Sequence, residues 1–203
     1  ASAVPPRIST RGRCGMGEPW LSVVGIGEDG IAGLSDAARG AVKSAEVLIG
    51  AERHLALIGS TSQERRSWGP RFDKGLPQLT ELRGRRVVAL VSGDPFWFGA
   101  GTAIAALFPQ GETTIHPAAS TFAWTAARLR WSLESTVKLG LHARPLALVR
   151  PHLRPGARII ALVRDGAAAK DLAAEVASAG FGPSRVHALE SLGGPRERVR
   201  EAT

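Results

Sequence analysis

The sequence predicts an α/β protein with largely parallel sheets flanked by helices. Short apolar runs typical of buried strands alternate along the chain with segments of helical character. The clearest run, residues 87–91, stops at Ser92-Gly93-Asp94-Pro95, where glycine, aspartate and proline favour a turn, and a helix of small residues follows at 99–107. Parallel strands end at one edge of a sheet, where open α/β sheets bind ligands. An ordinary strand–helix connection is the alternative for this corner.

The other elements of the first half follow from the same signals. Ser35, before an alanine-rich segment, predicts the N-cap of a helix, and the polar stretch 59–72 predicts an exposed loop. Strands are expected at 20–24 and 46–49, a helical turn or two at 52–58, and a weak helix at 76–82.

The second half alternates in the same way. A strand at 113–116 leads into a second small-residue corner, Pro117-Ala118-Ala119-Ser120-Thr121, and a helix over 122–129. Pro145 opens a short helix that ends near residue 152, and Gly180 closes a clear helix at 167–179. Further strands are expected at 137–141, 158–163 and 186–189.

These elements suggest two α/β lobes, one at 16–110 and one at 111–203, with a hinge at 107–112. Residues 1–15 are rich in proline, arginine and serine and lack an apolar core. They predict a disordered leader or an upstream start rather than a signal peptide, with Met16 as the natural beginning.

Composition limits the classes of function. The 203 residues are 44% hydrophobic, enough for a sizeable core, and no apolar run approaches the roughly 20 residues that cross a bilayer. The net charge of +8 favours an anionic partner, although an arginine-rich solvated surface explains it equally well. Nucleic acid is not expected, because aromatic and basic residues do not interleave. The single cysteine, Cys14, fits a reducing cytoplasm, and the scattered histidines lack metal-ligand spacing.

A glycine pattern after the first strand, Gly25-Ile26-Gly27-Glu28-Asp29-Gly30, matches the spacing of dinucleotide-binding loops. In that fold the helix opens on the glycines, whereas here the helix signal begins only at Ser35. A nicotinamide or flavin site is therefore disfavoured.

Four corners together resemble the tetrapyrrole methylase family of two-lobed S-adenosylmethionine methyltransferases. They are Val24-Gly25-Ile26-Gly27, Ser92-Gly93-Asp94-Pro95, Pro117-Ala118-Ala119-Ser120-Thr121 and Val163-Arg164-Asp165-Gly166, and their order covers nearly the whole chain from Trp20. Within the family, segments 50–55, 141–145 and 189–194 resemble the branch that methylates precorrins at C5 in cobalamin synthesis. The resemblance implies a cleft between the lobes, a precorrin substrate and a homodimer.

The resemblance also implies which residues bind. The cofactor would lie against residues of all four corners and their neighbours: Ile26, Ser92, Gly93, Asp94, Trp97, Ser120, Thr121, Leu141, His142 and Gly166. Arg53, Arg144 and Arg130 are candidates for the carboxylates of a precorrin, with a solvated surface role as the alternative. Asp94 would accept from the ribose or the ammonium, hold its loop, or else cap the following helix. His142 would contact ligand or make a structural hydrogen bond. No catalytic side chain is identified, because in-line methyl transfer needs mostly positioning.

The chain departs from the family pattern in three places. Glu28 stands where the family often has proline, and Ala51 stands where uroporphyrinogen methylases have aspartate, which disfavours that substrate. The chain is also expected to stop short of the family's final strand and helix. Two other functions stay open: a methylase of the same fold acting on another macrocycle, a protein or RNA, and a non-catalytic anion-binding module.

Overall fold

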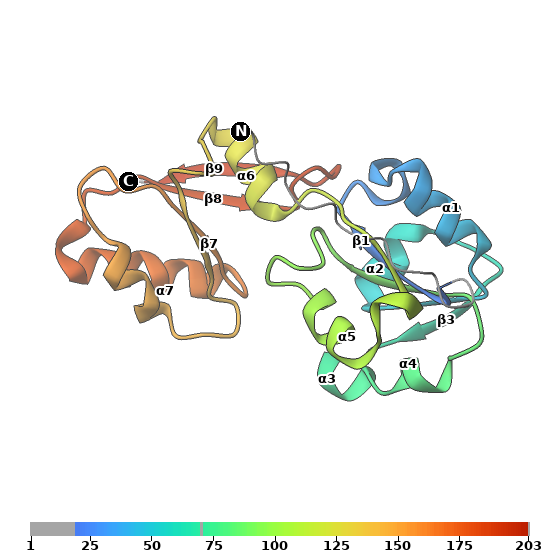
Figure 1. Ribbon diagram of the computed structural model, residues 1–203. Coiled ribbons are helices and arrows are strands. Elements are labelled where there is room, and N and C mark those ends of the chain that lie inside the picture. The colour runs from blue at the N-terminus through green and yellow to red at the C-terminus, as the bar shows by residue number, and fades with distance from the viewer. Residues whose placement is uncertain (1–18, 70, 203) are drawn as a thin grey trace, which may run out of the picture.

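A parallel sheet of five strands organises the first part of the chain (Figure 1). The computed structural model describes residues 19–69 and 71–202, so the expected leader at 1–15 lies outside the described residues. The strand order is β3-β2-β4-β1-β5, and every neighbouring pair is parallel. The strands are β1 (Leu21–Ile26), β2 (Val47–Gly50), β3 (Glu64–Ser67), β4 (Val87–Ser92) and β5 (Thr113–His116). The predicted α/β class is confirmed.

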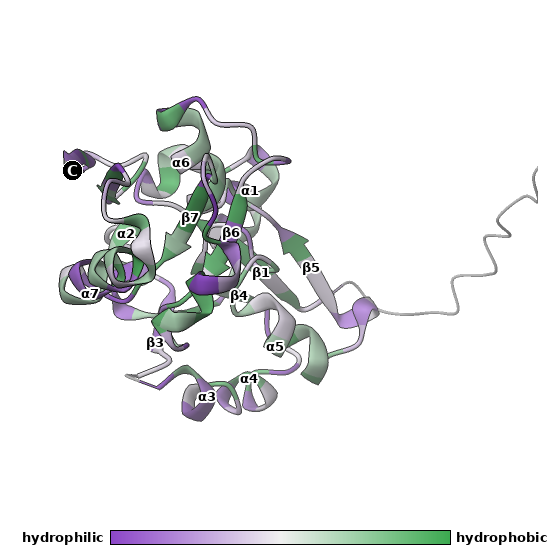
Figure 2. Cartoon of the chain, turned by 90° about the vertical axis from the view of Figure 1, so that its left-hand side faces the viewer, coloured by the Kyte–Doolittle hydropathy of each residue, from purple (hydrophilic) through white to green (hydrophobic). Residues whose placement is uncertain are grey.

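The sheet has a hydrophobic layer on each face, which explains the continuous apolar run of β4. Val87, Ala89 and Val91 belong to one core cluster, and Val88 and Leu90 belong to the other. The first layer includes side chains of α4 (Gln78–Glu81) and α5 (Gly101–Leu107), and the second includes those of α1 (Asp36–Ser44) and α2 (Glu52–Ile58). Figure 2 shows the sheet inside and polar residues on outer helices such as α3 (Phe72–Gly75). Two short 3-10 turns, η1 (Gly30–Gly33) and η2 (Gln110–Glu112), complete this part.

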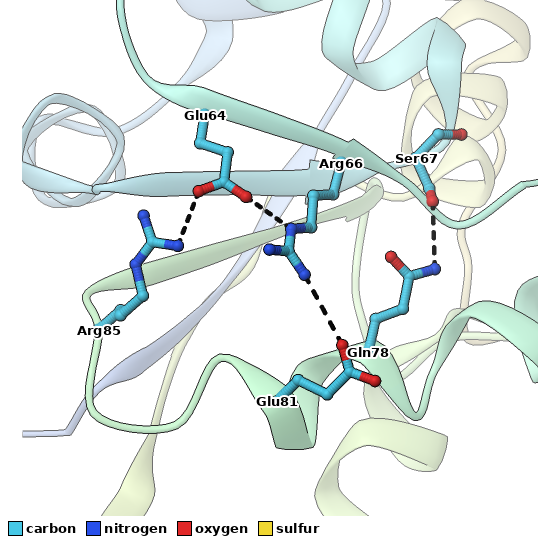
Figure 3. Close-up of polar contacts among 6 residues, drawn as sticks. All are labelled: Glu64, Arg66, Ser67, Gln78, Glu81 and Arg85. Carbon is cyan, nitrogen blue, oxygen red and sulfur yellow. Dashed lines mark hydrogen bonds and ion pairs between the residues drawn. The ribbon is translucent and has the colours of Figure 1, made fainter.

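Strand β3 corrects the prediction of a loop over 59–72. Its residues Glu64-Arg65-Arg66-Ser67 carry no apolar signature, yet they pair in parallel with β2. Figure 3 shows Glu64 between Arg66 and Arg85, with 2.7 Å from a carboxylate oxygen to each guanidinium. Charged side chains protect this edge of the sheet from pairing with another chain. The polar sequence of β3 is therefore that of an edge strand.

The second part of the chain contains two small sheets. Strands β6 (Val137–Gly140) and β7 (Ile159–Leu162) are parallel, whereas β8 (Val186–Glu190) and β9 (Arg198–Ala202) form an antiparallel hairpin. The other elements are α6 (Thr121–Leu129), η3 (Leu146–His152), α7 (Gly166–Val176) and η4 (Ala177–Phe181). Strand β9 was not predicted, because its arginines and glutamate hide the alternating pattern of a strand.

The last strand of the five-stranded sheet, β5, lies later in the sequence than the expected boundary between the lobes at residue 110. Strand β5 pairs with β1 from Leu21 opposite Thr113 to Val24 opposite His116. The sequence placed residues 113–116 after a hinge at 107–112, because the turn at Pro109-Gln110-Gly111 resembles a linker. The backbone pairing instead assigns this strand to the first sheet. In the described part of the chain, no helix has the length and hydropathy needed to cross a bilayer.

Candidate functional site

Three of the predicted corners meet at Gly25, near the end of β1. A Cβ atom on Gly25 would lie 1.9 Å from the carbonyl oxygen of Gly93 and 2.8 Å from the nitrogen of Ala118. The Gly93 N–H donates to the Ile26 carbonyl at 3.1 Å, and the Ala118 N–H donates to the Gly93 carbonyl at 3.3 Å. Only glycine permits so close an approach of three backbones. The corners after β1, β4 and β5 thus pack directly against one another through their backbones.

The corners after β4 and β5 line a cavity of about 1120 Å³ that reaches into the second part of the chain. Nine residues predicted from the sequence line it: Arg53, Ser92, Gly93, Asp94, Trp97, Ser120, Thr121, His142 and Gly166. The cavity extends between β7, α7 and β8, where its wall is largely apolar. A cavity of this size, with a few polar groups on apolar walls, is typical of a small-molecule site.

Four predicted residues lie elsewhere. Ile26 is 2% exposed and packs in the core with Val24 and Leu34. Leu141 and Arg144 line a second, smaller cavity of about 230 Å³ beside Phe98. Leu141 and His142 thus line different cavities, because the backbone turns directly after β6. Arg130, at the left-handed end of α6, is not among the residues that line either cavity.

Asp94 shapes its own corner. Its Oδ1 accepts a hydrogen bond of 2.9 Å from the Phe96 N–H, and the residue lines the large cavity. The alternative prediction, a cap on the following helix, does not describe this contact, because α5 begins only at Gly101 and its N-cap residue is Ala100. The carboxylate therefore fixes the turn while bordering the cavity.

The Ser120 hydroxyl caps the N-terminus of α6. It accepts a hydrogen bond of 3.1 Å from the Ala123 N–H, which makes Ser120 the N-cap of α6, and the residue is 7% exposed. Its neighbour Thr121 is exposed and borders the same cavity. Of the two predicted hydroxyls, Thr121 is the more accessible to a ligand.

The aromatic loop after β4 connects the two parts of the molecule. Trp97 stacks on Phe122 of α6, with 5.3 Å between the ring centroids. Phe98 lies 5.7 Å from Phe122, and a Cβ on Gly140 of β6 would lie 2.7 Å from its ring. Phe98 adopts a φ of +57°, a conformation that L residues rarely adopt. The loop therefore stands between the large and the small cavity.

His54 is a cavity residue that the sequence did not single out. It is 6% exposed, and its Nε2 lies 3.1 Å from Ser92 Oγ. Arg53 Nη2 donates to the same Oγ at 2.5 Å. Burial and the neighbouring Arg53 guanidinium lower the pKa of His54 to about 4, so the imidazole is neutral near pH 7. The residues His54 and Ser92 are far apart in sequence, and only the β4–β2 pairing brings them together.

The cavity lining is more basic than acidic. Five arginines line it, against three carboxylates; these are Arg53, Arg154, Arg164, Arg185 and Arg200 against Asp94, Asp165 and Glu190. Such a balance favours an anionic ligand. Over residues 19–69 and 71–202, no group of three or more histidine, cysteine or acidic side chains is placed to hold a metal ion.

Known proteins resemble most of the chain. The family model for Tetrapyrrole (Corrin/Porphyrin) Methylases matches residues 21–203. A precorrin-6Y C(5,15)-methyltransferase [decarboxylating] from Sinorhizobium sp is 46% identical over 182 residues, which are 89% of this chain and 44% of that protein. The cobalt-precorrin-7 C(5)-methyltransferase of Salmonella typhimurium is 28% identical over 88% of both chains.

Among solved structures, the precorrin-6Y methylase of Archaeoglobus fulgidus is similar, with a TM-score of 0.64 and 26% identity over 91% of this chain and 88% of that one. The chain spans less than half the length of the Sinorhizobium relative. The family match covers all but the first 20 residues, and it agrees with the corners that meet at Gly25. The chain belongs to the tetrapyrrole methylases.

Proposed function

We propose that this chain is an S-adenosylmethionine-dependent methyltransferase that methylates C5 of a precorrin in cobalamin biosynthesis. The observation that carries the proposal is that the corners after β4 and β5, which pack on Gly25, line one cavity in a tetrapyrrole methylase. The names of the Sinorhizobium and Salmonella relatives point to carbon 5 of a precorrin as the methylated position.

The residues at the corners fit the chemistry of the methyl donor. The cofactor carries an ammonium, a carboxylate, a ribose and an adenine, and the cavity offers the Asp94 carboxylate, the Thr121 hydroxyl, the His142 imidazole and the Trp97 ring. Asp94 would accept from the ribose or ammonium rather than face the sulfonium. A carboxylate facing the sulfonium would stabilise the ground state more than the transition state, because the positive charge of the sulfonium is lost during methyl transfer. Gly93 and Gly166 would permit close backbone approach.

When bound, the cofactor supplies an electrophilic methyl group. The protein's residues then hold the two reactants in line, and orientation alone can lower a barrier by roughly 7–11 kcal/mol. For the carboxylates of the precorrin, Arg53 is a better candidate than Arg144. It lines the cavity of the corners, whereas Arg144 borders the smaller cavity.

Calorimetry and mass spectrometry test the proposal in two steps. S-adenosylhomocysteine should bind with measurable heat, and incubation with S-adenosylmethionine and precorrin-7 should add the mass of one methyl group. The same mixture with uroporphyrinogen III or RNA should add none. Absence of heat would indicate a non-catalytic module, and methylation of uroporphyrinogen III or RNA would indicate another branch of the family.

We further propose that the chain works as a homodimer in the cytoplasm. Exposed apolar side chains, including Phe96 at 52% and Leu107 at 49%, provide surface that a second copy can cover. Light scattering after gel filtration should give twice the 21.3 kDa of the chain. A monomer at micromolar concentration would contradict the dimer.

A further inference from the structure

The Arg53 guanidinium is fixed by two neighbours at the rim of the cavity. Its Nη2 donates to Ser92 Oγ at 2.5 Å, and its Nη1 donates to Glu28 Oε1 at 3.2 Å. The side chain of Arg53 is still 57% exposed, so part of its fork of N–H donors stays accessible. A flexible arginine is thereby held in one orientation before any ligand arrives.

Ser92 is fixed in turn by His54. Ser92 Oγ accepts from Arg53 and lies 3.1 Å from the Nε2 of the neutral imidazole. In the tautomer that carries its proton on Nδ1, Nε2 accepts the hydrogen of the Ser92 hydroxyl. His54 is buried in the first turn of α2, and Arg53 is the residue before it in the same helix. Both partners of Ser92 therefore come from one rigid element. The contacts therefore run from the buried His54 through Ser92 to the exposed Arg53.

The charge at this point still favours an anion. Glu28 pairs with Arg53 and also lies 3.6 Å from Arg196, so one carboxylate faces two guanidinium groups. Together, Arg53, Arg196 and Glu28 carry a net charge of one positive unit. A second carboxylate approaching Arg53 meets attraction, and a guanidinium binds carboxylates through paired hydrogen bonds.

We propose that His54 is a positioning residue. Through Ser92 it holds the Arg53 guanidinium as a subsite for one carboxylate of the macrocycle. The inference rests on the proposed function, because it takes the precorrin as the ligand. Holding the arginine in place reduces the conformational entropy lost on binding, since an arginine side chain loses up to about 2 kcal/mol when it is immobilised.

The test separates substrate binding from cofactor binding in the full chain. In His54→Leu, we expect the KM for precorrin-7 to rise roughly tenfold, the effect of losing one hydrogen bond to a charged network. The affinity for S-adenosylhomocysteine, measured by calorimetry, should stay within about twofold of wild type. His54→Gln keeps a polar atom near the position of Nε2 and should restore most of the KM. His152→Leu is the matched control, because His152 does not line the large cavity.

A double-mutant cycle supplies the second readout. Ser92→Ala removes the link, so adding His54→Leu to it should raise the KM no further. If His54→Leu does not fold, a KM near wild type in His54→Gln together with a raised KM in Ser92→Ala carries the test.

Two results would overturn the inference: an unchanged KM in His54→Leu, or an equal loss of cofactor affinity and substrate affinity. A wild-type protein that fails to bind S-adenosylhomocysteine would instead refute the proposed function itself.

Discussion

The corners after β4 and β5 both contain small residues and a serine, but the two serine hydroxyls make different contacts. The Ser92 hydroxyl contacts Arg53 and His54, both of which line the large cavity. The Ser120 hydroxyl contacts the Ala123 N–H and begins α6. Both corners pack on Gly25, so the same backbone arrangement supports a side-chain network in one case and a helix in the other. A small-residue corner with a serine therefore does not by itself identify a ligand contact.

Gly25→Ala should remove the common support of both corners and have the largest effect. The added Cβ would meet the Gly93 carbonyl, so the corners must separate, and we expect a loss of about 3 kcal/mol or more in the free energy of unfolding. Gly40→Ala in α1 is the matched control, because a Cβ there meets nothing within 4 Å. It should stabilise the helix by up to about 1 kcal/mol. Urea denaturation measures both, and equal effects would show that the corners do not depend on Gly25.

The β4 corner should give the fold a pH dependence through His54. Burial lowers the folded-state pKa of His54 from 6.5 to about 4, so the unfolded chain takes up the proton more readily. The contribution of neutral His54 to the free energy of unfolding is complete above pH 6.5. About 3 kcal/mol of this free energy is lost as the pH falls from 6.5 to 4. The free energy of unfolding of His54→Gln should fall less over this pH range, because glutamine does not titrate. Parallel curves of unfolding free energy against pH for the two proteins would contradict the assignment.

Asp94→Ala should weaken the binding of S-adenosylhomocysteine by roughly tenfold, the scale of a lost hydrogen bond to a carboxylate. Asp94→Asn is the control for the turn, because its side-chain oxygen can still accept from the Phe96 N–H. Calorimetry on both variants distinguishes the two roles. Unchanged affinity in Asp94→Ala would leave Asp94 only its part in the turn.

Ser120→Ala should have the smallest effect, a loss of about 1 kcal/mol in the free energy of unfolding, because α6 loses its N-cap. Ser120→Asn should restore most of that stability, since asparagine is an equally good cap. Thermal unfolding of the three proteins checks the order. A fully stable Ser120→Ala would mean that the hydroxyl does not cap α6 in solution.

The sequence predicted the β4 strand and the place of its corner at the sheet edge because both follow from local rules, whereas the meeting of the corners was implied by the family resemblance. A strand buried on two faces is apolar throughout, and parallel strands end at one edge. Strands β3 and β9 were missed for the opposite reason: their charged residues lie in exposed strands that only backbone pairing reveals.

Side-chain direction and distant contacts were beyond the sequence. Leu141 was predicted with His142 to bind the cofactor, and Arg144 with Arg53 to bind the substrate. The backbone after β6 turns Leu141 and Arg144 toward a different cavity. His54 was not singled out among the scattered histidines. Its contact with Ser92 depends on the register that places Gly50 of β2 beside Leu90 of β4, which no local pattern encodes.

A crystal structure with S-adenosylhomocysteine tests the central claim most directly. We expect the ligand in the large cavity, touching the backbone at Gly93, the Asp94 carboxylate and the Thr121 hydroxyl. A ligand bound elsewhere, with these corners untouched, would contradict the claim that they form the methyl-donor site.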